Sequence, residues 1–214
     1  MTVTKHVYIV DDDSMVCTST AYFLTSSGYT AHTWCGGQAF LDDMPGLSPG
    51  CVLLDVRMPE IDGLQVIART HGRLAQLPVI VMTGHGNIAT AVSAMKLGAS
   101  DFHEKPFDEA ALLESLERLF ATLDKQVEAD DLYSDAQQRL KLLTKRESDV
   151  LNGLAAGLAN KVLAYRLGLS VRTVEMHRAN MMTRLGVRSL PEALRLGYLA
   201  GAVSVDGFDG TDTP

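Results

Sequence analysis

The sequence has no long apolar run and few cysteines, and these absences exclude several classes of protein. Its longest apolar stretches, such as residues 79–82, are far shorter than the about 20 residues that a membrane-spanning helix needs. The first ten residues, MTVTKHVYIV, pass directly into a strand-like segment and show no signal-peptide pattern. The three cysteines, Cys17, Cys35 and Cys51, are widely spaced and match no zinc pattern, so we expect small buried thiols in a reducing cytoplasm.

Charge is unevenly distributed along the 214 residues, whose net charge is −7. Residues 1–123 contain 7 Lys and Arg against 14 Asp and Glu, whereas residues 141–203 contain 10 against 4. The segment 124–140 and the tail 204–214 each carry a net charge of −3. An acidic first part joined to a basic block predicts two domains with different partners. Charge alone leaves open whether the basic block binds nucleic acid or is only a solvated surface.

The first 123 residues alternate short apolar runs with helical patterns. Continuous apolar runs at residues 7–10, 52–54 and 79–82 are typical of buried parallel strands, and weaker strands are expected at residues 31–33 and 101–103. Helical patterns fall between and after these strands, over Ser14–Ser26, Gly37–Asp43, 64–73, Ile88–Lys96 and 109–123. This alternation predicts, for residues 1–123, an α/β doubly wound five-stranded parallel sheet with its chemistry at the carboxyl ends of the strands.

The pattern changes after residue 123. An apolar stripe at helical spacing continues to Val127, while the segment 124–139 is polar and acidic. We expect a linker that begins as an extension of the preceding helix and then becomes flexible, and a wholly disordered linker is the alternative. Residues 140–202 show only helical patterns and predict a small all-α domain. The tail at residues 203–214 is rich in Gly and Asp and is expected to be flexible.

Polar residues stand at the carboxyl ends of four predicted strands. They are, in chain order, Asp11, Asp12 and Asp13, then Asp55, Thr83 and Lys105. Parallel strands end at one rim, so these side chains should converge, and a cation with oxygen ligands, best Mg²⁺, would relieve the repulsion among the carboxylates. Asp55 can then attack phosphorus, with Lys105 neutralising charge, Thr83 bonding a phosphoryl oxygen and Gly84 leaving room. Taken singly, a run of Asp is more often a loop or helix cap.

Residues 5–123 resemble a receiver domain, through the motifs VYIVDDD, LLDVRMPEIDG, VIVMTGHG and DFHEKPF. The resemblance implies a flavodoxin-like sheet with strand order 2-1-3-4-5. It also implies that Asp55 is the phosphoacceptor, and that Mg²⁺ is held by Asp12, Asp55 and the backbone carbonyl of Arg57, with Asp11 assisting through water. Thr83 and Lys105 match the switch and phosphate-contact positions, and Phe102 matches the aromatic residue that moves inward on activation.

Two further residues flank the predicted pocket. Arg57 and His85 each lie two residues after a pocket residue, at positions that in receivers border the pocket and influence the lifetime of the phosphoryl group. Simple surface roles are the alternative. The resemblance further implies a cis peptide bond between Lys105 and Pro106.

The basic block carries the signals of four helices. Thr144 and Glu147 have the spacing of a capping box, which predicts a helix that ends at Gly157. A short helix over Asn160–Leu167, a turn at Gly168, a helix over Val171–Leu185 capped by Ser170, and a last helix over Leu190–Leu199 follow. Two helices joined by a glycine turn, the second rich in Arg, indicate a DNA-reading helix-turn-helix, and a small helical domain with a charged face is the alternative.

The same block resembles the LuxR-type output domain through the stretch LTKRESDVLNGLAAGLANKVLAYRLGLSVRTVEMHRANMMTRLGV. A receiver followed by this output resembles the FixJ/NarL group of response regulators. We expect DNA contacts from Asn160, Lys161, Arg172, Thr173, Glu175, Met176, Arg178 and Arg184. Ala159 departs from the Ser, Thr or Pro usual at its position, so Asn160 is expected to cap the helix instead.

These resemblances imply a cytoplasmic transcriptional regulator that is controlled by phosphorylation. A sensor histidine kinase would donate the phosphate, and a phosphorylated homodimer would bind promoter DNA, with RNA polymerase as a candidate partner and no membrane partner. We expect no catalysis on a separate substrate. Three alternatives stay open: a constitutive DNA-binding regulator whose receiver only dimerises, an aspartyl-phosphate enzyme, which would need a further acid or base and a substrate cap, and regulation by protein sequestration.

Overall fold

The computed structural model describes residues 4–84 and 88–203 and divides the chain into two compact units, Met1–Gln126 and Val127–Pro214. The predictions made for His85 and for a flexible tail at residues 204–214 lie outside the described residues. Within the described part of the chain, no helix combines the length and the apolar character that a membrane span requires.

The first unit is built on a five-stranded parallel sheet. Its strands are β1 (His6–Val10), β2 (Thr30–Trp34), β3 (Gly50–Asp55), β4 (Val79–Thr83) and β5 (Asp101–Glu104), in the order β2-β1-β3-β4-β5. This confirms the predicted doubly wound sheet. Every residue of β3 and β4 is buried, whereas β2 and β5 at the edges are partly exposed. That difference explains why the apolar runs of the inner strands were plain in the sequence and those of the edge strands were weak.

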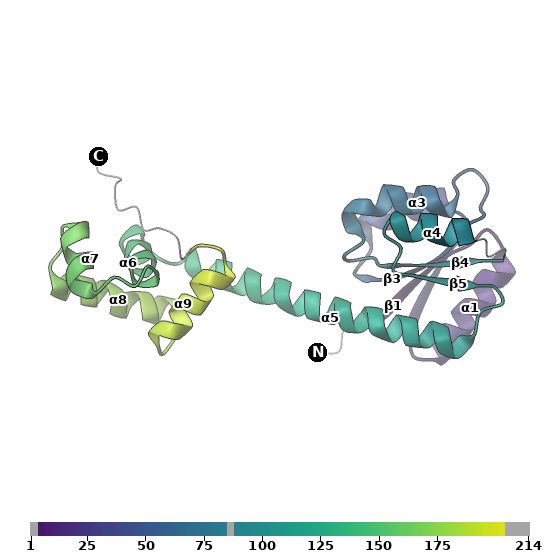
Figure 1. Ribbon diagram of the computed structural model, residues 1–214. Helices are drawn as coiled ribbons and strands as arrows, with labels where there is room; N and C mark the ends of the chain where they lie inside the picture. The colour runs from purple at the N-terminus through teal and green to yellow at the C-terminus, as the bar shows by residue number, and fades with distance from the viewer. Residues whose placement is uncertain (1–3, 85–87, 204–214) are drawn as a thin grey trace. The chain divides into compact units, whose positions relative to one another are not determined.

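Helices cover both faces of the sheet (Figure 1). One face packs against α2 (Gly37–Asp43), α3 (Gly63–Thr70) and α4 (Ile88–Lys96), and the other against α1 (Ser14–Ser26) and the first half of α5. Two short 3₁₀ turns, Met44–Gly46 and His71–Arg73, follow α2 and α3. The helix predicted over residues 64–73 therefore ends earlier as an α-helix, and its last three residues tighten into the second of these turns.

The fifth helix differs most from the sequence prediction. It runs without a break over Glu109–Leu140, so the predicted extension of the helix is present, but the prediction that the linker then becomes flexible was wrong. The segment contains neither Gly nor Pro and is rich in Ala, Leu, Glu, Gln and Arg, all good helix formers. Its early residues Leu112, Leu116 and Phe120 are buried in the first unit, while Ala136 is buried in the second. Propensity and packing at both ends thus outweigh the polar composition of the middle.

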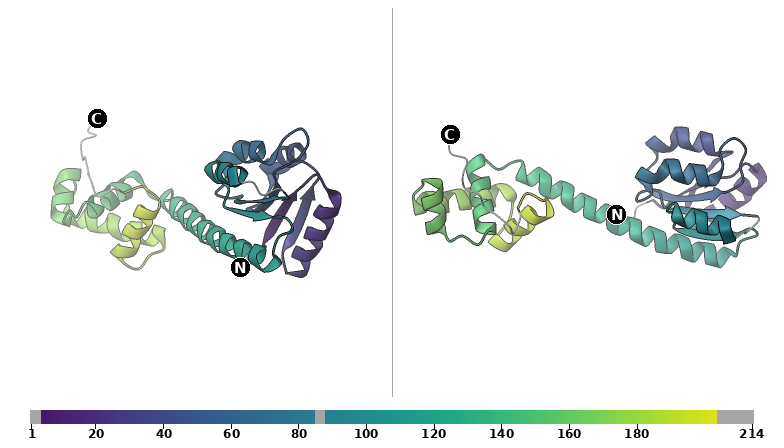
Figure 2. Two further views of the ribbon diagram at one scale, coloured as in Figure 1. Left: turned by 45° about the vertical axis from the view of Figure 1, so that its right-hand side comes forward. Right: turned by 45° about the horizontal axis from the view of Figure 1, so that its top comes forward.

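After α5, the described part of the second unit, up to residue 203, contains the helices α6 (Lys145–Ala155), α7 (Asn160–Leu167), α8 (Val171–Leu185) and α9 (Leu190–Leu199) (Figure 2). Their core is formed by buried aliphatic residues, among them Val150, Leu163, Val174, Met181 and Leu185. The predicted capping box at the start of α6 is confirmed, as is the cap of α8 by Ser170.

The predicted cap of α7 was wrong. Ala159, with extended backbone angles, occupies the N-cap position and supplies no side-chain hydrogen bond, so Asn160 is the first helical residue instead. The backbone carbonyl of Ala159 accepts hydrogen bonds from the amides of Val162 and Leu163, which fixes where the helix begins.

Candidate functional site

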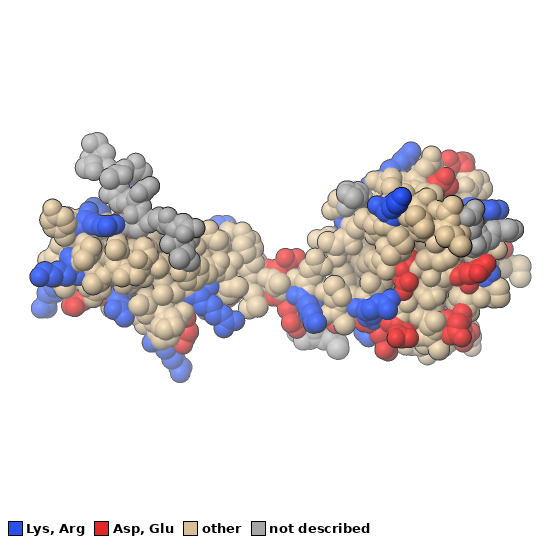
Figure 3. All heavy atoms as spheres, viewed as in Figure 1, with Lys and Arg blue, Asp and Glu red and all other residues tan. Residues whose placement is uncertain are grey.

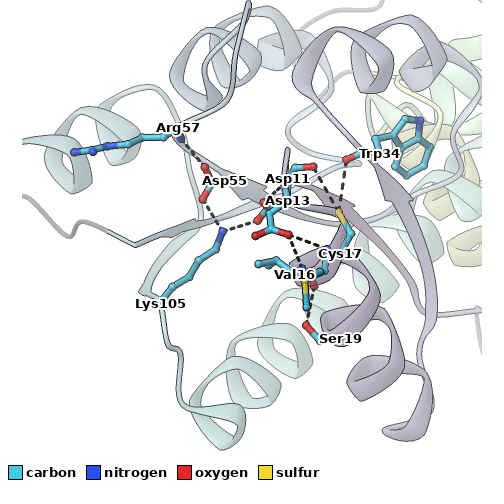
Figure 4. Close-up of polar contacts among 10 residues, drawn as sticks. Asp11, Asp13, Val16, Cys17, Ser19, Trp34, Asp55, Arg57 and Lys105 are labelled. Atoms are coloured by element: carbon cyan, nitrogen blue, oxygen red, sulfur yellow. Dashed lines mark hydrogen bonds and ion pairs between the residues drawn. The ribbon is translucent and has the colours of Figure 1, made fainter.

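The carboxylate of Asp55 lies at the carboxyl end of β3 and is buried (Figure 4). Its Oδ1 accepts a hydrogen bond of 2.6 Å from the Lys105 ammonium, and its Oδ2 accepts one of 2.6 Å from the backbone amide of Arg57. The two oxygens are thus held in a fixed orientation by a charge and by the turn that follows the strand.

Lys105 joins Asp55 to a second carboxylate. Its Nζ lies 2.5 Å from Oδ2 of Asp11, which follows β1 and is also buried, while Oδ1 of Asp11 accepts from the amide of Asp13. The parallel register of β1 beside β3 brings the ends of these two strands to one rim, as the sequence predicted. Three residues that are distant in the chain therefore form one charged cluster.

The electrostatics of this cluster are dominated by burial and by mutual pairing. Burial raises the pKa of the Asp55 carboxyl above its ordinary value, and the hydrogen bond from Lys105 offsets part of that rise. Burial alone lowers the pKa of Lys105, but its hydrogen bonds to Asp11 and Asp55 together raise that pKa above the ordinary value. The ammonium therefore stays charged, and the ionised form of Asp55 depends on a neighbouring cation.

The remaining predicted pocket residues lie on the adjoining strands. Thr83 ends β4 and is buried, and its backbone carbonyl accepts a hydrogen bond of 2.8 Å from the amide of Lys105. Gly84, directly after it, is exposed. Phe102 in β5 is half-buried and packs against the core beneath α2, α3 and α4. The predicted cis peptide bond between Lys105 and Pro106 is present.

The three consecutive aspartates separate into different roles. Asp13 is the N-cap of α1, and its carboxylate accepts from the amides of Met15 and Val16. Asp12 is exposed, and no group of three or more Asp, Glu, His or Cys side chains that could hold a metal occurs within residues 4–84 and 88–203. The expected convergence of three carboxylates is therefore reduced to two, Asp11 and Asp55. Two carboxylates with water still fit Mg²⁺, which is commonly bound through one or two carboxylates and keeps several waters.

The predicted DNA-reading residues lie on α7 and α8. Val174, Met181 and Leu185 turn one face of α8 into the core, and the opposite face exposes Arg172, Glu175 and Met176. Lys161 on α7 is exposed, whereas Asn160, Thr173 and Arg178 are half-buried. Most charged side chains visible on the unit that contains α6–α9 are Lys or Arg (Figure 3).

Two of these residues have partners inside their own domain. The Nε of Arg184 lies 3.1 Å from Oε1 of the buried Glu147, and its Nη1 donates to the carbonyl of Leu142. Arg184 thus neutralises the charge of Glu147, the buried residue of the capping box. This structural role could not be predicted from the position of Arg184 on its helix. The hydroxyl of Thr173 lies 2.8 Å from that of Ser170, so it takes part in the cap of α8.

Sequence reasoning also missed the surroundings of the cysteines. Cys17 and Cys51 are buried, as expected, but Cys35 is exposed, because it follows the edge strand β2. The Sγ of Cys17 lies 3.6 Å from the backbone oxygen of Asp11, and burial raises the pKa of this thiol to about 11. No spacing rule links residues 11, 17 and 35, so the sequence offered no signal for this contact.

Comparison with known proteins agrees with the two-unit division. Residues 7–117 match the family described as the response regulator receiver domain, and residues 141–196 match the bacterial regulatory proteins of the luxR family. The chain is 45% identical over 207 residues to the transcriptional regulatory protein FixJ of Azorhizobium caulinodans, covering 97% of each. Among solved structures, response regulator StyR is 34% identical with a TM-score of 0.82, covering 92% of this chain and 99% of that one.

A second solved structure, full-length FixJ from B. japonicum, is 40% identical with a TM-score of 0.56 and covers 95% of this chain and 100% of that one. The chain therefore belongs to the response regulators, and its receiver followed by a LuxR-type helix-turn-helix makes it one of the FixJ/NarL type. Such a chain is a DNA-binding transcriptional regulator of a two-component system, controlled by phosphorylation.

Proposed function

We propose that Asp55 is the residue that receives the phosphoryl group from a sensor histidine kinase. A carboxylate oxygen of Asp55 forms the new bond to phosphorus while the phosphorus–nitrogen bond of the kinase's phosphohistidine breaks, and the imidazole nitrogen takes a proton. The observation that carries the proposal is the hydrogen bond between Lys105 and Asp55, because the ammonium lies where charge on the transferred group develops.

Mg²⁺ is the cofactor that this pocket fits. Asp11, Asp55 and the backbone carbonyl of Arg57 would hold it, with the exposed Asp12 assisting through water. When bound, the ion neutralises charge on the phosphoryl oxygens. Lys105 then has two roles, since its ammonium neutralises charge on the two carboxylates and also contacts the phosphoryl group.

Phosphorylation is read out through the strands beside Asp55. The hydroxyl of Thr83 turns toward the phosphoryl group, and Phe102 moves from its half-buried place further inward, which changes the face formed by α4 and β5. Along α4, Ile88, Val92 and Met95 are 82%, 45% and 49% exposed at spacings of four and three residues. An apolar stripe of this kind suits a homodimer interface between two receivers.

The output is binding of double-stranded promoter DNA by the second unit. The exposed face of α8 would enter the major groove, with Arg172 and Arg178 reading guanine edges or phosphates and Glu175 and Met176 beside them. Asn160 and Lys161 at the start of α7, with Thr173, would contact the phosphate backbone. Arg184 we assign to the interior of the domain. We assign RNA polymerase as a further partner of the DNA-bound regulator, and the protein acts in the cytoplasm without catalysis on a separate substrate.

The proposal is tested by sedimentation and by binding to a promoter fragment, with and without Mg²⁺ and beryllofluoride, a mimic of the phosphoryl group. Wild type should shift from monomer to dimer and bind DNA more tightly, and Asp55→Asn should do neither. Val92→Asp should block the dimer but keep beryllofluoride binding, whereas Ser93→Asp, off the stripe, should behave as wild type. If DNA binding and dimerisation were the same with and without beryllofluoride, the alternative of a constitutive DNA-binding regulator would be supported instead.

A further inference from the structure

Two cysteines lie near one edge of the first unit. Cys17 is in the first turn of α1, and the thiol of Cys35 is among the groups that act on the Cys17 thiol. The Sγ of Cys17 also lies 3.9 Å from the backbone oxygen of Trp34, the residue directly before Cys35 (Figure 4). Cys17 is buried and Cys35 is exposed, so one member of the pair is open to solvent and the other is not.

Regular backbone structure holds both cysteines in place. Val10 pairs with Trp34 in the parallel register of β1 and β2, and the amide of Asp11 donates to the carbonyl of Trp34 at 3.1 Å. On the other side, the amide of Cys17 donates to the carbonyl of Asp13 at 3.0 Å, which fixes Cys17 on the first turn of α1. The fold therefore sets the position of Cys17 and of the backbone directly before Cys35.

We propose that Cys17 and Cys35 form a reversible disulfide, and that this thiol pair is a redox modification site beside the Asp55 pocket. Glutathione disulfide is the kind of oxidant that the geometry suits. The exposed Cys35 thiolate attacks it, releasing one glutathione and leaving a mixed disulfide. Cys17 then loses its proton to water, attacks the sulfur of Cys35 and releases the second glutathione. Two protein thiols are oxidised, and one small disulfide is reduced to two thiols.

The pair is coupled to the pocket through Asp11. The Cys17 thiol donates to the backbone oxygen of Asp11 at 3.6 Å, and the carboxylate of the same residue is bound to Lys105. Oxidation removes that donor and ties the start of α1 to the end of β2, with Asp11 between them. We expect the affinity for Mg²⁺ and beryllofluoride to fall by about threefold to fivefold, because the loss of one weak hydrogen bond corresponds to a change of that size. This coupling, unlike the disulfide itself, rests on the proposed function of Asp55.

The disulfide is tested by equilibrating the full chain in a series of reduced and oxidised glutathione buffers, blocking free thiols under denaturing conditions, and measuring mass. Wild type should fall from three blocked thiols to one, with a linked peptide pair containing Cys17 and Cys35, independent of protein concentration. Cys51→Ser should keep the same transition, and Cys35→Ser, a change at an exposed position, should abolish it. A stable glutathione adduct on Cys35 with Cys17 still free, or a disulfide between two chains, would overturn the proposal.

The coupling is tested on the same samples by titrating Mg²⁺ and beryllofluoride against the fluorescence of Trp34. Reduced wild type should bind, oxidised wild type should bind about threefold to fivefold more weakly, and oxidised Cys35→Ser should match the reduced protein. Equal binding before and after disulfide formation would refute the coupling. If Mg²⁺ and beryllofluoride did not bind the reduced protein, the proposed function would be contradicted instead. The number of blocked thiols would still show whether the disulfide forms.

Discussion

The Nζ of Lys105 lies 2.6 Å from Oδ1 of Asp55 and 2.5 Å from Oδ2 of Asp11, so one ammonium balances two buried carboxylates from different strands. Lys105 is 50 positions from Asp55 and 94 positions from Asp11 in the sequence, so only the parallel sheet brings these charges together. The cluster therefore serves both the stability of the first unit and its proposed chemistry, and substitutions can separate the two.

Lys105→Met should leave Asp11 and Asp55 facing each other without a counter-charge. We expect the free energy of unfolding in Mg²⁺-free buffer to fall by about 3 kcal/mol, since removing one partner of a buried ion pair strands the other. Because the competing ammonium is gone, added Mg²⁺ should restore more stability in the variant than it adds to wild type. Denaturant unfolding followed by Trp34 fluorescence measures both. Lys96→Met, at an exposed position on α4, is the matched control. An equal effect of Mg²⁺ on variant and wild type would argue against a metal beside these carboxylates.

Gly63→Ala should disturb the phosphoacceptor through the backbone. A Cβ at Gly63 would come within 2.3 Å of the carbonyl oxygen of Asp55 and 2.9 Å of the Cα of Val56, and neither backbone atom can move aside easily. We expect a loss of about 1–3 kcal/mol in the free energy of unfolding and weaker beryllofluoride binding. Gly46→Ala, where a Cβ meets open space, should change neither. Unaltered stability in Gly63→Ala would mean that the turn after β3 is more adaptable than its contacts suggest.

Glu147→Gln separates capping from charge pairing in the second unit. Gln can keep the reciprocal cap with Thr144 but loses the ion pair with Arg184, which we expect to cost about 1–2 kcal/mol at pH 7. Although burial by itself raises the pKa of Glu147, hydrogen bonds from Thr144 and the charge of Arg184 hold it below its ordinary value of about 4.5. The ionised form is therefore the stabilising one. Its contribution should be complete above pH 4.5 and should vanish as the pH falls through the lowered pKa.

Hydrogen exchange of the α6 amides in full-length wild type and Glu147→Gln checks this pH dependence, since the only Trp lies in the first unit. Protection should differ at neutral pH and converge at acidic pH. A difference that persisted unchanged in acid would assign the effect to packing and not to charge.

Arg172→Ala and Arg184→Ala should affect different properties, the first DNA binding and the second stability. Arg172 is exposed on α8, and we expect its loss to weaken promoter binding by about 1–3 kcal/mol, roughly fivefold to 150-fold, with little change in stability. Arg184→Ala should instead reduce the stability of the second unit, because it leaves Glu147 buried without its cation. Promoter titrations at one fixed salt concentration, with Arg195→Ala as an exposed control for charge, measure the first effect. Wild-type affinity in Arg172→Ala would remove this residue from the proposed interface.

Much of the fold was predictable because its signals are local. The inner strands β1, β3 and β4 are continuous apolar runs, and α1, α2, α4, α7, α8 and α9 begin and end where the sequence patterns predicted. The order of polar residues at the strand ends also predicted that Asp55 and Lys105 meet. The prediction failed where local signals conflict. In the acidic second half of α5, composition indicated a linker, but the helix propensity of the residues prevailed.

The sequence by itself determined the division into a receiver and a helix-turn-helix block, the parallel sheet and the identity of the charged residues at its rim. Only the tertiary structure decided which residues touch: that Asp13 caps α1 while Asp11 pairs with Lys105, that Arg184 pairs with Glu147, and that the thiol of Cys17 lies against the backbone oxygen of Trp34. The reason is physical. Periodicity and capping act within a few residues, whereas burial and ion pairing depend on distances between segments that the chain separates widely and the fold brings together.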